Sequence, residues 1–391
     1  MSEALRVLLV DPSLFTAPYD AALTEGLLEV GVEPLWAVRP TREADRQELP
    51  EARSLPLFYG WIERQAWLPP RLRSAAKGLA HVVGLGRLVS RAVAERPDAV
   101  HFQWVVVPPL DSLAMALLRL YRPLVLTVHD TVPYNGDRLS PLQRWGFELP
   151  LRLADRIIVH TRSGRDALLA RGVPAEKLAV IPHGALPLHA APPAVSTYPD
   201  DGRYRFVLFG ELKPYKGLDV LLEALALVDP ELREQLHVVV AGRPRMDLRP
   251  LLERRRELGL ERVVDVRPQR LSEAEMADLF QAADCFLFPY RQIDASGVYY
   301  LVKSLGKWLI ASRVGIFAED LGEQHGELVP VADPSALAAA ISEAVKARRH
   351  APAAGAGSDW SEIGRLTRAL YEDARAARAG AFSGARLGAS G

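Results

Sequence analysis

Short runs of branched and aromatic residues alternate along this chain with longer segments of helical pattern, and this alternation constrains the fold more than any other feature. In the first half, the runs that read as strands are 6–10, 32–37, 99–102, 124–128, 157–159 and 178–181, with amphipathic segments at 19–30, 72–95 and 163–170. A second series begins near Arg205, with strands at 206–209, 237–241, 263–266, 285–288 and 308–311 and helices at 217–227, 251–258 and 272–282. Strands that alternate with helices form parallel sheets flanked by helices. Two such series predict an α/β chain with two Rossmann-like, doubly wound domains.

A proline-rich stretch marks the boundary between the two series. The chain has 391 residues, which exceeds one ordinary domain. Its linker signal is the group Pro187, Pro192, Pro193 and Pro199. We therefore predict domains at 1–186 and 205–358, joined by a linker at 187–204. A last helix is expected over 359–378, before a Gly-, Ala- and Ser-rich tail over 379–391 that should fray.

The charge and cysteine content argue against several classes of function. Lys plus Arg and Asp plus Glu each number 48, so the basic excess typical of a general nucleic-acid binder is missing. The single cysteine, Cys285, lies in an apolar run and can form neither a disulfide framework nor a zinc-ligand cluster, which fits a reducing compartment. The amino-terminal residues lack the pattern of a signal peptide, and no apolar stretch approaches the roughly 20 residues that cross a bilayer. We expect a soluble cytoplasmic protein, and the inner face of the membrane stays open as its location.

Ligands of open α/β sheets bind at the carboxyl ends of strands, so the loops that follow strands are the candidate sites. The strand 206–209 is followed by Gly210-Glu211-Leu212-Lys213-Pro214-Tyr215-Lys216-Gly217. Lys213 and Lys216 suit a diphosphate, since their ammonium groups supply positive charge and Gly217 permits close approach of the backbone. The alternative is a solvated turn with two surface lysines.

The loop after the strand 285–288 leads into another helix. Ser296, Gly297 and Val298 would open that helix, and the free N–H groups of a helix start can donate to phosphate oxygens. Asp294 lies just ahead of the helix. It would either cap the helix or bind sugar hydroxyls.

Histidines and aromatic residues gather at the strand ends of the first half. His129 would hydrogen-bond a sugar hydroxyl or a developing charge, or it is a structural histidine. His101, Gln103 and Trp104 stand together at another strand end, where amide and aromatic groups suit carbohydrate, although a core role for Trp104 stays open. His183 follows the last strand and would face the entrance of a cleft between the domains.

In their order and spacing, these motifs resemble the GT-B fold glycosyltransferases, and in particular the family-four group of nucleotide-sugar transferases. The resemblance covers nearly the whole chain. It rests on 209–224, 240–242, 283–284, 286–289, 294–298, 305–307, 311–315, Glu319 and Gly326 in the second half, and on 127–130, 155–161 and 180–184 in the first. It implies two Rossmann-like domains that face each other across a cleft, with the last helix crossing back to the amino-terminal domain.

The resemblance assigns donor binding to the second domain. Lys216 would hold the donor diphosphate together with Gly210 and the helix start at 296–298. Arg267 and Gln269 lie in the segment that borders the base. The arginine that usually follows the first glycine is Glu211 here, so Lys213 would supply the second charge.

Two departures from the family pattern affect recognition. Asp294 falls near the first carboxylate of the family's paired-carboxylate motif, but Leu301 stands at or near the place of the second, which usually holds the nucleotide ribose. Many relatives carry a glycine pair after the first strand, where this chain has 11–19, including Tyr19. Acceptor choice is therefore the least transferable inference. The acceptor-side candidates are Tyr19, His101, Gln103, Trp104 and His183.

The resemblance also implies a mechanism. His129 matches a histidine that contacts the donor sugar near the reacting carbon, and His129 and Asp294 are the predicted catalytic residues. The lysine pair and the helix start would stabilise the leaving diphosphate, with the anomeric configuration retained and the departing phosphate taking the acceptor proton. No Asp-x-Asp motif stands at a strand end, so neither a metal nor another cofactor is expected, and the nucleotide sugar is a substrate. The acceptor would be a carbohydrate, a lipid-linked sugar or a small molecule.

Residues 71–91 form a basic amphipathic segment in the first domain. Its basic residues are Arg71, Arg73, Lys77, Arg87 and Arg91. Such a helix can lie on an anionic membrane and reach a lipid-linked acceptor. The alternative is a solvated helix face.

Other functions on this fold stay open. A sugar-nucleotide epimerase or hydrolase would turn over the donor without an acceptor, and a phosphorylase would need a cofactor lysine. A non-catalytic sugar-nucleotide-binding protein would bind without turnover. A nicotinamide dehydrogenase is disfavoured, because no Gly-x-Gly-x-x-Gly follows the first strand.

Overall fold

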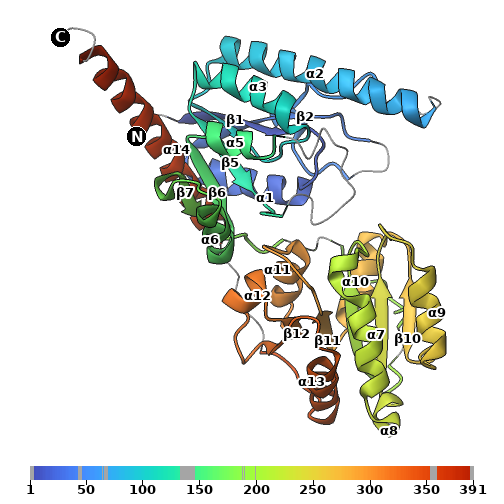
Figure 1. Cartoon of the computed structure of the whole chain (residues 1–391). Coiled ribbons are helices and arrows are strands. Elements are labelled where there is room, and N and C mark those ends of the chain that lie inside the picture. The colour runs from blue at the N-terminus through green and yellow to red at the C-terminus, as the bar shows by residue number, and fades with distance from the viewer. Residues whose placement is uncertain are drawn as a thin grey trace. The chain divides into compact units, whose positions relative to one another are not determined.

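The computed structural model divides the chain into two compact units. It describes residues 4–42, 46–63, 65, 69–132, 146–186, 188, 190–198, 200–352 and 359–387. The first unit combines Met1–Gly184 with Ser358–Gly391, and the second is Ala185–Gly357. Each unit is a parallel β-sheet with helices packed against it (Figure 1).

Within the described residues, the sheet of the first unit has seven parallel strands in the order β3-β2-β1-β4-β5-β6-β7. Their bounds are β1 (Leu5–Asp11), β2 (Val32–Val38), β3 (Ser54–Pro56), β4 (Ala99–Phe102), β5 (Leu124–Val128), β6 (Arg156–Val159) and β7 (Leu178–Val180). The helices are α1 (Ala17–Glu29), α2 (Pro70–Glu95), α3 (Pro108–Arg119), α5 (Glu148–Leu153), α6 (Arg162–Ala170) and α14 (Trp360–Leu387). The strand order reverses between β1 and β4, which makes that pair the topological switch point of the sheet.

The described part of the second unit has six parallel strands in the order β10-β9-β8-β11-β12-β13. They are β8 (Tyr204–Phe209), β9 (Leu236–Ala241), β10 (Val264–Arg267), β11 (Cys285–Phe288), β12 (Trp308–Ser312) and β13 (Gly326–Val329). Its helices are α7 (Leu218–Leu227), α8 (Pro230–Arg233), α9 (Arg249–Glu257), α10 (Glu273–Ala282), α11 (Gly297–Ser304), α12 (Gly315–Asp320) and α13 (Pro334–Lys346). Here the switch point lies between β8 and β11.

The sequence dictates these elements through burial and capping. The central strands are covered on both faces, so a strand such as β9 is a continuous apolar run rather than an alternating one. Some helix starts carry side-chain caps: Ser272 and Glu275 form a capping box on α10, and Asp333 accepts from the backbone N–H of Ala336 on α13. Both sheets are therefore specified by local signals that agree with the global pattern.

The predicted fold class, two doubly wound α/β domains, is confirmed, while individual elements differ from the prediction. The structure adds β3, β13, α3 and α13, which the strand and helix patterns did not identify. β3 spans three residues and β13 only four, and both lie at sheet edges, where short runs carry little periodicity. The tail beyond 378, predicted to fray, continues as helix to Leu387, since its alanines favour helix.

The last helix, α14, is part of the first unit and packs closely on α1. A Cβ placed on Gly364 would lie 2.1 Å from the carbonyl oxygen of Gly26, and one on Gly26 would lie 2.0 Å from that of Trp360. Polar contacts also hold the helix, including an ion pair between Arg156 and Asp373 at 2.5 Å. The absence of side chains at Gly26 and Gly364 is therefore what permits the two backbones to meet.

No helix among the described residues is both long enough and apolar enough to cross a membrane.

The close approach of α1 and α14 gives a matched prediction. Gly364→Ala should lower the free energy of unfolding by about 2 kcal/mol or more, because the added methyl group meets backbone that cannot move aside. Gly86→Ala, in α2, meets nothing within 4 Å and should raise stability by about 0.5–1 kcal/mol, since alanine favours helix. Urea unfolding of the full chain measures both. Equal effects of the two substitutions would contradict the proposed close contact.

Candidate functional site

The loops after β8 and β11 converge at the switch point of the second sheet. A Cβ placed on Gly210 would lie 2.6 Å from Lys216 Nζ and 3.5 Å from Val298 Cγ2. Gly210 thus touches both the lysine loop and the start of α11. The two loops predicted separately from the sequence form one site at the place where open α/β sheets bind ligands.

Lys216 is the most unusual charged group of this site. It is only 5% exposed, its Nζ donates to the carbonyl oxygen of Phe209 at 2.8 Å, and it lies 5.1 Å from the centroid of the Tyr290 ring. Burial lowers the pKa of Lys216 to about 7, against an ordinary value near 10.5. The interpretation as a solvated surface lysine is therefore wrong for Lys216.

Left-handed glycines let the lysine loop follow this path. Gly210 has φ of +106° and Gly217 has φ of +69°, values that residues with a side chain rarely adopt. A Cβ on Gly217 would also lie 2.0 Å from the carbonyl oxygen of Pro289. The same glycine that opens α7 therefore fixes the packing of the lysine loop against the loop after β11.

Lys213 and Lys216 share their surroundings with a carboxylate and an arginine. Glu211 Oε2 lies 3.7 Å from Lys213 Nζ, and Glu211 Oε1 lies 2.5 Å from Arg245 Nη2. Arg245 follows β9 and its role was not predicted. When Lys216 is protonated, the cations Lys213, Lys216 and Arg245 and the carboxylate of Glu211 together carry a net charge of +2. A diphosphate diester carries two negative charges, so the two charges match.

The start of α11 is arranged as an anion site. Ser296 is the N-cap, and its Oγ accepts from the backbone N–H of Tyr299 at 3.3 Å. Among the described residues, the backbone N–H groups of Gly297 and Val298 donate to no acceptor. Unsatisfied N–H groups at a helix start attract phosphate oxygens, and the helix dipole adds to the attraction.

Asp294 is not the cap of α11, because Ser296 fills that position. Its carbonyl oxygen instead accepts from the backbone N–H of Ile316 at 2.9 Å, which ties the loop after β11 to α12. The predicted sugar contact of Asp294 therefore stays the open interpretation. Leu301, near the expected place of a second carboxylate, packs against the apolar core of the sheet.

Arg267 and Gln269, in the segment predicted to border the base, differ in their contacts with the protein and in their exposure. Arg267 Nη1 donates to Tyr198 Oη at 2.6 Å, its Nε donates to Asp265 Oδ2 at 2.8 Å, and its guanidinium lies 4.3 Å from the Tyr198 ring centroid. Its side chain is thus held by protein partners, and its place beside the base stays a prediction. Gln269 is exposed.

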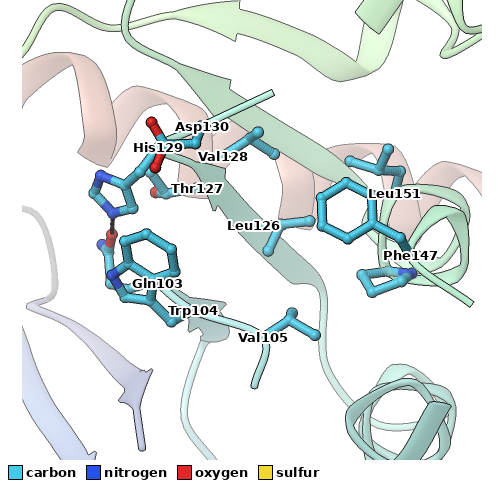
Figure 2. A pocket seen from close by; sticks show the side chains of 11 residues that line it. Gln103, Trp104, Val105, Leu126, Thr127, Val128, His129, Asp130, Phe147 and Leu151 are labelled. Atoms are coloured by element: carbon cyan, nitrogen blue, oxygen red, sulfur yellow. Dashed lines mark hydrogen bonds between the residues drawn. The ribbon is translucent and has the colours of Figure 1, made fainter. Parts of the chain in front are cut away.

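In the first unit, a small pocket that is partly open to solvent lies beside His129 (Figure 2). Its polar lining is Gln103, Thr127, His129 and Asp130, and its other lining residues are Trp104, Val105, Leu126, Val128, Phe147, Pro150 and Leu151. The rings of His129 and Trp104 stack with an interplanar angle of 10° and centroids 4.9 Å apart. The pocket therefore offers hydrogen-bonding groups at one side and a mainly apolar wall at the other.

A chain of hydrogen bonds fixes the proton positions on His129. His160 Nδ1 lies 3.0 Å from the carbonyl oxygen of Ile181 and must donate to it, so a neutral His160 accepts at Nε2 from His129 Nδ1, 3.2 Å away. Burial lowers the pKa of His160 to about 4 and that of His129 well below its ordinary value, so both rings are neutral at pH 7. His129 Nε2 then carries a lone pair and lies 3.0 Å from Gln103 Oε1, so this contact is a hydrogen bond when the Gln103 amide turns its NH₂ group toward the ring.

Most acceptor-side candidates are buried and contact protein groups, and their acceptor role stays a prediction. His101 is fully buried, with Tyr371 Oη and Thr127 Oγ1 each 2.7 Å from a ring nitrogen. Tyr19 is buried among His129, His160, His183 and Trp360, and His183 Nδ1 lies 2.6 Å from the carbonyl oxygen of Gly184. Gln103 is also buried, and its amide contacts His129. These residues position His129, and Trp104 alone among the five candidates stays partly exposed.

A buried carboxyl pair, not predicted from the sequence, organises the loop after β1. Asp11 accepts from the backbone N–H groups of Ser13 and Thr16, and burial raises its pKa to about 6. Burial and the Asp11 charge raise the pKa of Asp20 well above its ordinary value. Thr16 Oγ1 accepts from Trp104 Nε1 at 3.0 Å, which links this loop to the ring that stacks on His129.

The described residues contain no group of three or more His, Cys, Asp or Glu side chains placed to hold a metal ion.

Two family models match successive parts of the chain. The model described as "Glycosyltransferase Family 4" matches residues 21–185, and the model described as "Glycosyl transferases group 1" matches residues 203–347. Together they span both switch-point sites. The chain belongs to the family-four-like GT-B glycosyltransferases.

Known proteins support the same assignment. This glycosyltransferase is 30% identical over 244 residues to the D-inositol 3-phosphate glycosyltransferase of Saccharomonospora viridis, a match that covers 56% of either chain. It is 25% identical over 307 residues to the GDP-mannose:glycolipid 4-beta-D-mannosyltransferase of Xanthomonas campestris pv. campestris, covering 72% of this chain and 82% of that one. The crystal structure of HepE from Anabaena with UDP and glucose has a TM-score of 0.65 at 18% identity, covering 97% of this chain and all of HepE. The chain thus spans just over half the length of the first of these relatives.

Several residues of the glycosyltransferase site were not predicted from the sequence. Tyr290 lies under Lys216, Arg245 pairs with Glu211, and His160 completes the hydrogen-bond chain to His129. Each follows the carboxyl end of a strand, so the rule that located His129 and Lys216 also marks them. Trp360 and Tyr371 carried no such signal, because they come from a helix far along the chain.

The lowered pKa of Lys216 predicts a pH-dependent donor affinity. A free enzyme with Lys216 near pKa 7 must take up a proton to bind a diphosphate, so affinity should fall about 20-fold between pH 6.5 and 8.5. Isothermal titration with the best-binding sugar nucleotide measures this, because the diphosphate diester keeps its charge throughout. The Lys216→Met variant should bind more weakly and without this slope. A flat profile for the unaltered enzyme would refute the assignment.

Proposed function

We propose that this glycosyltransferase moves a hexose from a nucleotide-diphosphate sugar to a carbohydrate or lipid-linked acceptor, with retention of configuration and without a metal ion. One observation carries the donor half of the proposal. Buried Lys216 and the side chain of Val298 border Gly210 at the switch point of the second sheet, and in the described structure the N–H groups of Gly297 and Val298 at the start of α11 are unsatisfied. A diphosphate supplies the charge and the acceptor oxygens that these groups lack.

The same groups account for departure of the nucleotide. As the glycosidic bond breaks, negative charge grows on the diphosphate, and fixed cations and N–H dipoles stabilise it without reorganisation. The net positive charge of the lysine loop supports this role. The departing phosphate oxygen is then the base that takes the acceptor proton, which fits a site whose histidines are neutral and already hydrogen bonded.

His129 would contact the sugar in one of two ways. Either its backbone would bind a sugar hydroxyl, or a sugar hydroxyl would replace Gln103 as the partner of its ring nitrogen. Both ring nitrogens already have partners in Gln103 and His160. Stacking on Trp104 holds the ring in place, so a sugar that reaches the pocket meets a preorganised surface. Asp294 would bind the sugar hydroxyls from the second unit.

The pocket beside His129 supports an acceptor with an apolar part. Val105, Phe147 and Leu151 line it opposite the polar group. The Xanthomonas relative is named for transfer to a glycolipid, and a glycolipid joins hydroxyl groups to hydrocarbon. A lipid-linked sugar would place its hydroxyl groups against the polar lining of the pocket and its hydrocarbon against the apolar lining.

The transferase proposal predicts a specific defect in an Asp294 variant. A thermal-shift screen against UDP-, GDP-, ADP- and dTDP-sugars identifies the donor, and a panel of alkyl glycosides and lipid-linked sugars supplies the acceptor. Asp294→Asn should lower kcat/KM about 100-fold, through lost sugar contacts in the transition state. The matched control Asp247→Asn, at an exposed ion pair of the same unit, should leave the rate unchanged.

The same assay separates the alternatives. Product of retained anomeric configuration, read by NMR and formed equally with excess EDTA, is the expected result. Donor turnover that ignores every acceptor would point to an epimerase or hydrolase, and tight binding without turnover would point to a binding protein. A product of inverted configuration would overturn the proposed mechanism.

A further inference from the structure

The outer side of α2 is apolar. The buried side of the helix, with His81, Leu85 and Leu88, packs toward the sheet. Its opposite side is uncovered and carries Leu72, Leu79, Val82, Val83 and Val93. A helix that is apolar on both sides normally has both sides covered. The exposed side of residues 71–91 thus carries apolar as well as basic side chains.

The neighbouring helix α3 extends this apolar surface. Its exposed side carries Leu113, Leu117, Leu120 and, just past its end, Tyr121. The chain crosses from β3 to β4 through α2 and from β4 to β5 through α3, in the same direction along the sheet, so right-handed connections place both helices in one layer. Figure 1 shows α2 and α3 side by side on the face of the sheet away from α1. Their outer sides form one surface, named here the α2–α3 face.

The α2–α3 face exposes more large apolar side chains than the whole described part of the second unit. Its nine large apolar side chains are between 40% and 65% exposed. The described part of the second unit exposes only four such side chains, at Val195, Leu227, Leu305 and Val331. Contiguous apolar surface of this kind usually marks an interaction site.

The charge around the α2–α3 face is positive. Leu79, Val83, Arg87 and Arg91 follow one another at four-residue spacing, so the cations continue the apolar line on the same side of the helix. Glu95 is the single carboxylate of α2 and pairs with Arg91 at 2.9 Å, while the single carboxylate of α3, Asp111, is buried. The chain as a whole is electrically neutral, so this positive surface reflects a local distribution.

We propose that the α2–α3 face docks on an anionic lipid surface. Apolar side chains would enter the boundary between headgroups and acyl chains, Tyr121 would lie at that boundary, and Arg71, Arg87 and Arg91 would meet lipid phosphates. A second copy of the chain suits this face less well. A twofold dimer would press the same cations against one another, with only the partly exposed Glu95, already paired with Arg91, as a carboxylate on the two helices. This inference is independent of the proposed transfer reaction, which requires no membrane.

Sedimentation of the full chain with vesicles tests the docking surface. The unaltered protein should bind vesicles of phosphatidylglycerol and phosphatidylcholine, should bind pure phosphatidylcholine far less, and should be released by salt. Each basic residue near an anionic surface contributes about fivefold in affinity, so Arg87→Glu with Arg91→Glu should weaken binding by about 25-fold or more. Leu79→Asp with Leu117→Asp should have a similar effect.

Matched controls keep the result interpretable. Val195→Asp with Leu227→Asp places the same charges on exposed apolar positions of the second unit and should leave vesicle binding unchanged. Thermal unfolding shows whether each variant is folded, and gel filtration over a range of concentrations detects dimers. Failure of the unaltered protein to bind anionic vesicles, or dimerisation lost in the same α2–α3 variants, would overturn the proposal.

Discussion

An ammonium group held out of water at the switch point of the second sheet is the interaction on which this protein's chemistry depends. Removing a charge from water is unfavourable, and in the described part of the free enzyme Lys216 gains in return the Phe209 carbonyl, the Tyr290 ring and the nearby charge of Glu211. The surrounding structure maintains that burial with two left-handed glycines and close backbone contacts. An arrangement that is costly without a ligand becomes favourable when a diphosphate brings compensating negative charge.

The candidate site of the first unit is built from neutral side chains rather than charged ones. Its switch-point loops lead to histidines, a glutamine and a tryptophan whose hydrogen bonds run in a fixed order from the Ile181 carbonyl to His129. Because burial keeps these rings neutral, the unit supplies shape and hydrogen bonding rather than charge. Helix α14 anchors this network through Tyr371 and Trp360, so the end of the chain stabilises the surroundings of His129.

The sequence predicted the fold class and the main loops because both follow from local patterns. Strands covered on two faces are continuous apolar runs, and ligand loops follow their carboxyl ends, so Lys216, Ser296 and His129 were all found by one rule. The burial of individual site residues was not predictable from such local patterns, because it depends on partners that are distant in the sequence. His101 was assigned to the acceptor because the partner that satisfies it, Tyr371, lies 270 residues away. That Arg267 stacks on Tyr198 was not predictable either, because the two residues lie 69 positions apart in the sequence.

Donor affinity in a Lys213→Ala and Lys216→Ala double variant tests the central claim most directly. Hydrogen bonds to charged groups contribute about 1.5–3 kcal/mol each, so calorimetry at neutral pH should show at least a 100-fold rise in the Kd of the sugar nucleotide. The exposed Lys346→Ala on α13 controls for the loss of a surface charge and should bind like the unaltered enzyme. An unchanged Kd in the folded double variant would contradict the account of the diphosphate site.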